Sequence, residues 1–168
     1  MDYEPGLLDN GTKETFRPIW NKVMSQGTRT HQLAMFVVYD SPMQFFSGNP
    51  SQGLLEPRFM ELLGSIPSTW DETLVLDGKL GEYIVTARKK GSDWFVGAMS
   101  NWTGRTVRLP LSFLEAGTYT ATVCADGVNA DKWASDYTIT EKATTKSDSL
   151  IIAMAPGGGC MVRLQKVK

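Results

Sequence analysis

The spacing of apolar residues changes near residue 70, and this change limits the folds that the chain can adopt. Before it, apolar residues recur at helical spacing between loops that contain proline and glycine. After it, apolar and polar residues alternate in short runs, which is typical of strands. The two patterns belong to different structural layers. We therefore expect two regions, 1–67 and 68–168, of which only the second has the pattern of a complete domain.

The first region has the pattern of a few loops, helices and a short strand. Along the chain we expect an extended start and loop over 1–27, a buried helix capped by Thr28 or Thr30, a buried strand over 43–46, a loop over 48–53 and a helix over 56–63. Helix, strand and helix in this order are typical of the last units of a parallel (β/α)8 barrel. Region 1–67 therefore reads as an incomplete α/β remnant.

The second region predicts an antiparallel sheet. Over 83–88, the positions Tyr83, Val85 and Ala87 alternate with Ile84, Thr86 and Arg88. Lys89, Lys90 and Gly91 then turn the chain into Trp94, Val96 and Ala98, which predicts a hairpin. Further strands are expected over 106–111, 118–125, 137–141, 150–154 and 160–165. About seven strands in roughly 100 residues fit a β-sandwich with Greek-key connections. The predicted fold class is mainly β, with the sandwich preceded by the α/β remnant.

Charge and composition exclude several classes of partner. The net charge is −1, so no broad basic field is available to nucleic acid. The sequence has neither a long apolar run nor the pattern of a signal peptide, so we expect no membrane partner and no export signal. Cys124 and Cys160 lack the spacing of a metal site. They are either buried free thiols or a disulfide between neighbouring strands.

Few residues are candidates for chemistry. Asp2 and Glu4 flank Tyr3 after what reads as a barrel strand, so these three residues either line a substrate site at the barrel mouth or lie in a solvated loop. His31 has no partner acid or nucleophile at a recognisable spacing, which favours a structural hydrogen bond. Asp126 begins a turn that lacks the spacing of a calcium loop. The glycines of 157–159 predict a hairpin turn.

The five tryptophans leave a second interpretation open. An aromatic face stacks on the apolar face of a sugar ring, and Trp70, Trp94, Trp102 and Trp133 are candidates for such a contact. Trp94, however, alternates with core positions, and packing explains most of these residues. An independent carbohydrate-binding module is therefore the alternative to a structural domain.

Several long segments resemble the C-terminal end of glycoside hydrolase family 97. They are MDYEPG, MSQGTRTHQLAMFVVYDSPMQ, IPSTWDETLVLDGKLGEYIVTARKKGSDWFVGAMSNWT, DGVNAD and MAPGGG, and the resemblance covers almost the whole chain. It implies α-glucosidases or α-galactosidases with an N-terminal β-sandwich, a central barrel and a C-terminal β-sandwich, located in the periplasm of Bacteroides-like bacteria. Residues 1–67 would be the end of the barrel and 68–168 the C-terminal domain.

The resemblance also implies which parts of the chemistry lie elsewhere. In the family, the catalytic carboxylates and the glutamates that hold calcium belong to the N-terminal domain and earlier barrel strands, which align before Met1. We therefore expect no catalytic residue, metal or cofactor in this chain, and calcium in the full-length parent.

The expected partners are the rest of the glycosidase and a possible second copy of the chain, while an oligosaccharide is the substrate of the parent. We also expect the apolar helix face over 33–38 to be exposed without the missing barrel, and the isolated chain to self-associate.

Overall fold

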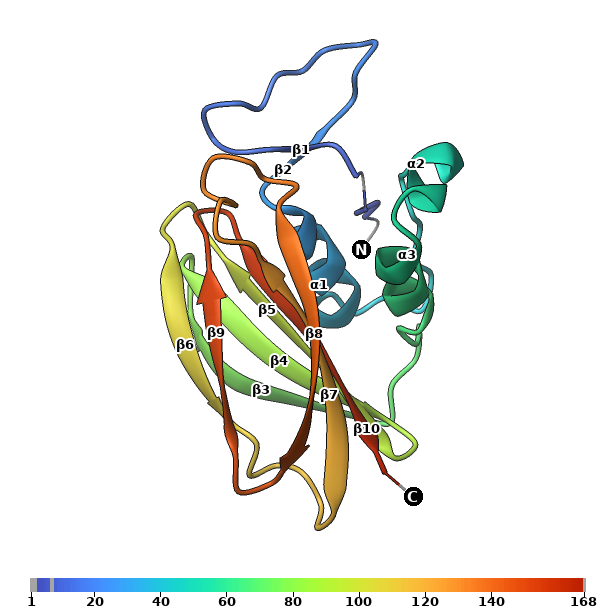
Figure 1. Ribbon diagram of the computed structural model, residues 1–168, viewed down its shortest axis with the longest axis vertical. Helices are drawn as coiled ribbons and strands as arrows, with labels where there is room; N and C mark the ends of the chain where they lie inside the picture. The colour runs from blue at the N-terminus through green and yellow to red at the C-terminus, as the bar shows by residue number, and fades with distance from the viewer. Residues whose placement is uncertain (1–2, 7, 168) are drawn as a thin grey trace.

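A six-stranded antiparallel sheet forms the middle layer of the molecule (Figure 1). The computed structural model describes residues 3–6 and 8–167. In spatial order, the strands of this sheet are β3 (Glu72–Lys79), β4 (Tyr83–Lys90), β5 (Asp93–Ser100), β10 (Gly159–Lys166), β7 (Thr118–Asp126) and β8 (Tyr137–Thr145). The hairpin predicted from alternation is confirmed as β4 and β5, which pair from Tyr83↔Ser100 to Lys90↔Asp93.

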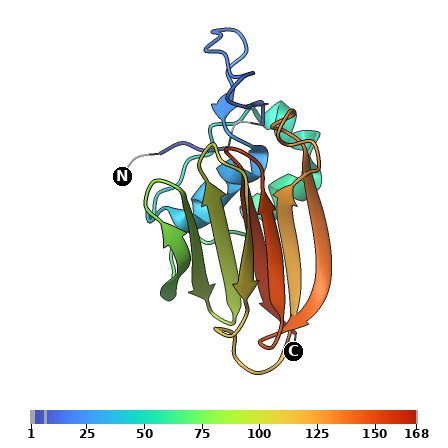
Figure 2. The ribbon, with the colours of Figure 1, turned by 90° about the vertical axis from the view of Figure 1, so that its left-hand side faces the viewer.

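A second sheet packs against one face of the first. It contains β6 (Arg105–Pro110) and β9 (Ser149–Met154), which are antiparallel neighbours. Figure 2 shows these two strands in front of the large sheet and the helices behind it. The predicted β-sandwich is confirmed. The glycine turn 157–159 is not a hairpin as predicted, because β9 and β10 belong to different sheets.

The core between the two sheets follows from the alternation in the sequence. Val85 and Ala87 of β4 lie opposite Ala98 and Val96 of β5, and all four are fully buried. The small sheet contributes Ile152, which is also buried in this core. Burying an aliphatic side chain of this size stabilises the fold by about 1.5–3 kcal/mol. The inward positions of both sheets therefore hold the sandwich together.

The third layer lies on the opposite face of the large sheet (Figure 1). It consists of β1 (Asn10–Gly11), β2 (Ser25–Gln26), α1 (Arg29–Val38), α2 (Pro50–Leu54), α3 (Pro57–Gly64) and the loops between them. The predicted cap of α1 is confirmed, because the Thr28 hydroxyl accepts a hydrogen bond from the His31 amide at 3.2 Å. None of the helices among the described residues has both the length and the apolar character needed to span a membrane.

Three expectations for residues 1–67 are wrong. The helix face over 33–38 is not exposed, because Leu33 and Val37 are fully buried against the large sheet. Residues 43–46 form no strand, and Met43 is 67% exposed. The predicted loop over 48–53 contains α2, which begins because the Asn49 side chain accepts from the Ser51 amide at 2.9 Å.

The two cysteines are free and buried, which settles the alternative that the sequence left open. Cys160 lies in the core between the sheets, whereas Cys124 faces the helical layer. Because they point to opposite faces of neighbouring strands, they do not form a disulfide. Burial raises the pKa of the Cys124 thiol to about 12.

Candidate interaction surface

The residues predicted to line a substrate site lie at the start of the chain. Asp2 is outside the described residues. The Tyr3 ring is half-buried. It packs edge-on against Tyr39, the residue that follows α1, with ring centroids 5.1 Å apart, and against Phe36 of α1, with ring centroids 6.5 Å apart. Glu4 is exposed. The structure thus gives Tyr3 a packing role on α1, and the substrate-lining role of these residues stays a prediction.

A buried carboxylate ties the helical layer to the sandwich. The Asp126 carboxylate accepts hydrogen bonds from the Thr30 hydroxyl and from the amides of Ala155 at 2.8 Å and Gly159 at 3.2 Å. Burial raises the pKa of Asp126 despite these donors. This arrangement joins the start of α1 to the segment between β9 and β10. Asp126 is the last residue of β7, at the start of the turn that the sequence predicted, and the role of its carboxylate as a junction between the layers was not predicted.

His31 belongs to the same junction. Its Nδ1 lies 3.0 Å from the carbonyl oxygen of Gly158, to which the neutral ring donates. Burial lowers the pKa of His31 and keeps the ring neutral near pH 7. The predicted structural hydrogen bond of this histidine is confirmed.

We find no cluster of three or more His, Cys, Asp or Glu side chains that is suited to hold a metal ion among residues 3–6 and 8–167. What the surface does offer is a large hollow at one end of the sheet. It has a volume of about 750 Å³ and lies over β3, β4 and the end of β5. Its apolar lining includes Val75, Leu80, Ile84 and Met99, and His31 of α1 also lines it. We therefore treat this region as a candidate interaction surface.

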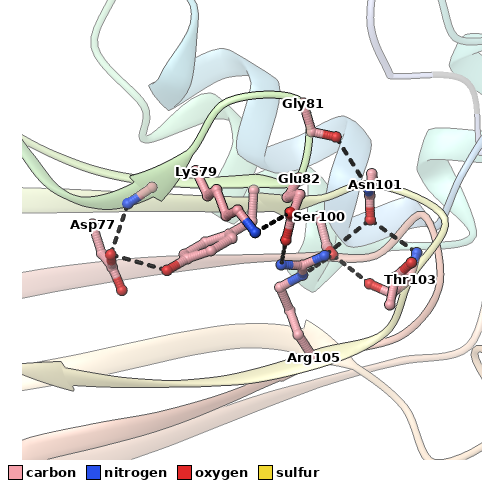
Figure 3. Close-up of polar contacts among 10 residues, drawn as sticks. Asp77, Lys79, Gly81, Glu82, Ser100, Asn101, Thr103 and Arg105 are labelled. Atoms are coloured by element: carbon pink, nitrogen blue, oxygen red, sulfur yellow. Dashed lines mark hydrogen bonds and ion pairs between the residues drawn. The ribbon is translucent and has the colours of Figure 1, made fainter.

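A polar network fixes the rim of this hollow (Figure 3). Arg105 donates to the Ser100 hydroxyl at 2.9 Å, the Glu82 carboxylate at 3.2 Å and the Asn101 side-chain oxygen at 3.1 Å. The Asn101 amide side chain donates in turn to the Gly81 carbonyl at 3.0 Å. One guanidinium thus links the β3–β4 turn to the end of β5 and the start of β6.

The β3–β4 turn is itself well defined. The Glu82 amide donates to the Lys79 carbonyl at 2.9 Å, and Gly81 has φ +76°, which favours glycine. The Lys79 ammonium lies 2.5 Å from the Glu82 carboxylate. Hydrogen bonds from Lys79 and then Arg105 lower the pKa of Glu82. The turn therefore holds the fully exposed Leu80 at its tip.

Sequence reasoning missed this surface because it missed β3. The pairing of β3 with β4 shifts between Val75 and Asp77, so Leu76 is an extra residue in a β-bulge. Leu74 and Leu76 both pack against the sandwich core. The apolar run 73–76, which ends at Asp77 and Gly78, was the signal that predicts a strand here.

Comparison with known proteins assigns the domain. The family model described as "Glycosyl-hydrolase 97 C-terminal, oligomerisation" matches residues 69–165. The chain belongs to this family. The resemblance to glycoside hydrolase family 97 is thereby confirmed, and the matched residues cover the β-sandwich from β3 to all but the last residue of β10.

Two curated proteins described as alpha-galactosidases are among the relatives of the chain. The chain is 42% identical over 165 residues to a retaining alpha-galactosidase of Bacteroides thetaiotaomicron, covering 98% of this chain and 25% of that protein. It is 33% identical over 127 residues to a probable retaining alpha-galactosidase of Streptomyces bingchenggensis, covering 76% of this chain and 18% of that protein.

A solved structure of a family 97 enzyme from Pseudoalteromonas sp. strain K8, in complex with acarbose, matches with a TM-score of 0.90 and 34% identity. The match covers all of this chain and 26% of that enzyme. The chain thus spans about a quarter of the length of the Bacteroides thetaiotaomicron alpha-galactosidase and of the Pseudoalteromonas enzyme.

Proposed function

We propose that this chain is the noncatalytic C-terminal part of a family 97 α-glycosidase, in which the sandwich supports the catalytic barrel and joins copies of the enzyme. The observation that carries the proposal is the family model over residues 69–165, whose description is oligomerisation. The share of the relatives that is covered supports it, since three quarters of the retaining alpha-galactosidase lies outside the match. In this proposal, residues 1–67 are the last units of the barrel.

The chemistry of the parent follows from the same relatives. Both curated relatives carry the description of a retaining alpha-galactosidase, which favours α-galactosides over α-glucosides as substrates of the parent and a retaining mechanism. Retention needs two carboxyl groups about 5–5.5 Å apart. We place these groups, a calcium site and the oligosaccharide substrate in the part of the parent before Met1, and the parent in the periplasm.

A direct assay tests the noncatalytic role. The purified chain, supplied with calcium, is expected to release no p-nitrophenol from p-nitrophenyl α-galactoside or α-glucoside. Turnover that disappears in Asp2→Asn or Glu4→Gln would overturn this part of the proposal, because the catalytic carboxylates would then lie within the chain.

Sedimentation velocity tests the joining of copies. We expect the sedimentation coefficient to rise with protein concentration. A monomer at every concentration up to about 100 μM would contradict an oligomerisation role, because the dissociation constant between copies would then lie above about 100 μM, a binding free energy weaker than about −5.5 kcal/mol.

One observation favours the alternative function, an independent sugar-binding module. Trp133 is 72% exposed and borders a hollow of about 450 Å³ that is also lined by Asn129, Lys132 and Asp136. An exposed aromatic face beside polar side chains suits a sugar ring. Titration with galactose or maltotriose, followed by tryptophan fluorescence, tests it. Saturable binding that Trp133→Ala abolishes and Trp20→Ala preserves would support this function, and no fluorescence change would exclude it for these sugars.

A further inference from the structure

We infer that the β3–β4 turn and the hollow beside it form a two-fold contact between copies of this chain. The inference rests on the proposed function in one respect, namely that copies of the chain associate. It adds where they meet and which side chain is the anchor. In this contact, Leu80 of each copy enters the hollow of the other.

The first argument is the exposure of Leu80 on a fixed support. Its side chain is fully exposed at the tip of the turn. The turn is held by the Lys79–Glu82 ion pair of 2.5 Å and by the bond from Asn101 to Gly81. Because these bonds already order the backbone, burying Leu80 in a partner costs little additional conformational entropy. A fully exposed leucine on a turn whose backbone is held in this way is suited to anchor an interface.

The second argument is the position of the hollow. Its apolar side chains include Val75, which is 69% exposed, together with Ile84 and Met99. Leu80 stands at the edge of this same hollow. A projecting group next to a matching recess is self-complementary under a two-fold rotation, in which each residue of one copy meets the reciprocal residue of the other. This geometry suits a second copy of the chain as the occupant, in agreement with the oligomerisation description of the family.

Charge around the turn agrees with this occupant. Lys79 and Glu82 carry opposite charges on either side of Leu80, and their side chains are 68% and 36% exposed. A two-fold contact can set Lys79 of one copy near Glu82 of the other, so the charges at the rim attract. The charges at the rim therefore do not oppose a contact between two identical copies of this surface.

The edge of the sheet limits the form of the contact. β3 is an edge strand, and its bulge between Val75 and Asp77 interrupts the row of backbone groups that another strand would pair with. The copies therefore meet through side chains at the turn rather than through a continuous sheet. A two-fold contact of this kind closes on itself and stops at a dimer.

The test compares two leucines of similar exposure by sedimentation equilibrium. Leu80→Glu places a charge in the proposed contact and should raise the dissociation constant of the dimer about 30-fold or more, as expected for a hot spot. Leu55→Glu, on the exposed α2 side of the molecule where Leu55 is 82% exposed, is the matched control and should leave the constant unchanged. Val75→Glu, in the hollow itself, should act like Leu80→Glu. Circular dichroism checks that each variant is folded.

The outcomes separate the location from the function. A wild-type dimer that persists in both Leu80→Glu and Val75→Glu overturns the location but leaves the oligomerisation role standing. Dissociation by Leu55→Glu alone also overturns it and moves the contact to the α2 side. A wild-type chain that is monomeric at all concentrations overturns the location and the oligomerisation role together.

Discussion

His31 shows at the residue scale how one buried side chain makes the fold sensitive to acid. The ring donates to the Gly158 carbonyl at 3.0 Å, and the Asp126 carboxylate of the same junction interacts with it electrostatically. Burial lowers the pKa of His31 below its ordinary value of 6.5, and Asp126 opposes this shift only in part. The unfolded chain therefore binds the proton more readily than the folded chain does.

The sign of the resulting pH dependence follows directly. The contribution of His31 to stability is complete above pH 6.5 and is lost as the pH falls toward its lowered folded pKa. We expect the melting temperature of the wild type to fall between about pH 7.5 and 5.5, and His31→Asn to show a smaller fall, since asparagine can donate without titrating. Equal slopes in thermal melts of the two proteins would contradict this account.

At the scale of elements, the close approach of α1 to β5 depends on a missing side chain. A Cβ at Gly97 would lie 2.8 Å from a methyl group of Val38 and 2.9 Å from the Ala34 carbonyl oxygen. Overpacking of this kind costs about 1–3 kcal/mol. We expect Gly97→Ala to lower the free energy of unfolding by this amount in urea titration. Gly64→Ala in α3, where an added Cβ meets nothing within 4 Å, should be neutral or stabilising.

The elements also show what sequence alone can predict. The β4–β5 hairpin was predictable because two runs rich in β-branched and aromatic residues, 83–88 and 94–98, flank a short turn that contains Gly91. β3 was missed because Leu74, Val75 and Leu76 form a consecutive apolar run rather than alternating with polar residues, and the bulge at Leu76 interrupts the pairing with β4. The apolar run over 43–46 suggested a buried strand, but no neighbouring strand pairs with it, and it lies in a loop where Phe45 is 51% exposed.

The candidate surface was beyond prediction for a related reason. Its hollow is formed by α1, the β3–β4 turn and the end of β5, which come together only through the sheet order. No local sequence pattern predicts that these three segments lie side by side. In contrast, the structural role of His31 and the position of Asp126 at a turn were predictable, because neither residue has the spaced partners that catalysis or metal binding requires.

For the whole molecule, a polar junction joins the helical layer to the sandwich. Arg29 of α1 lies 2.5 Å from the Glu56 carboxylate, which also accepts from the Tyr137 hydroxyl of β8 at 2.6 Å. Burial opposes the ionisation of Glu56, but Tyr137 and Arg29 hold its pKa below the usual value. Because one carboxylate contacts two layers, we expect them to unfold as one unit.

Substitution of Glu56 tests this coupling. Glu56→Gln should lower stability by about 1–2 kcal/mol through weakened charged hydrogen bonds. Wild-type melting followed by tryptophan fluorescence and by far-ultraviolet circular dichroism should give coincident transitions. Glu61→Gln, at an exposed position of α3, is the control and should leave stability unchanged. Separate transitions in the wild type would show that the helical layer and the sandwich are independent.

The position of β10 also bears on how the protein is made. This strand follows all the other described strands in sequence, yet it lies between β5 and β7 and pairs with both. A ribosome adds about 5–20 residues per second, so β3 to β5 and β7 to β8 are made before β10. Until β10 is made, these two groups of strands have unpaired edges and cannot join into one sheet. Only the arrival of residues 159–166 closes the gap. Newly made chains are therefore most exposed to misassembly just before synthesis of this segment is complete.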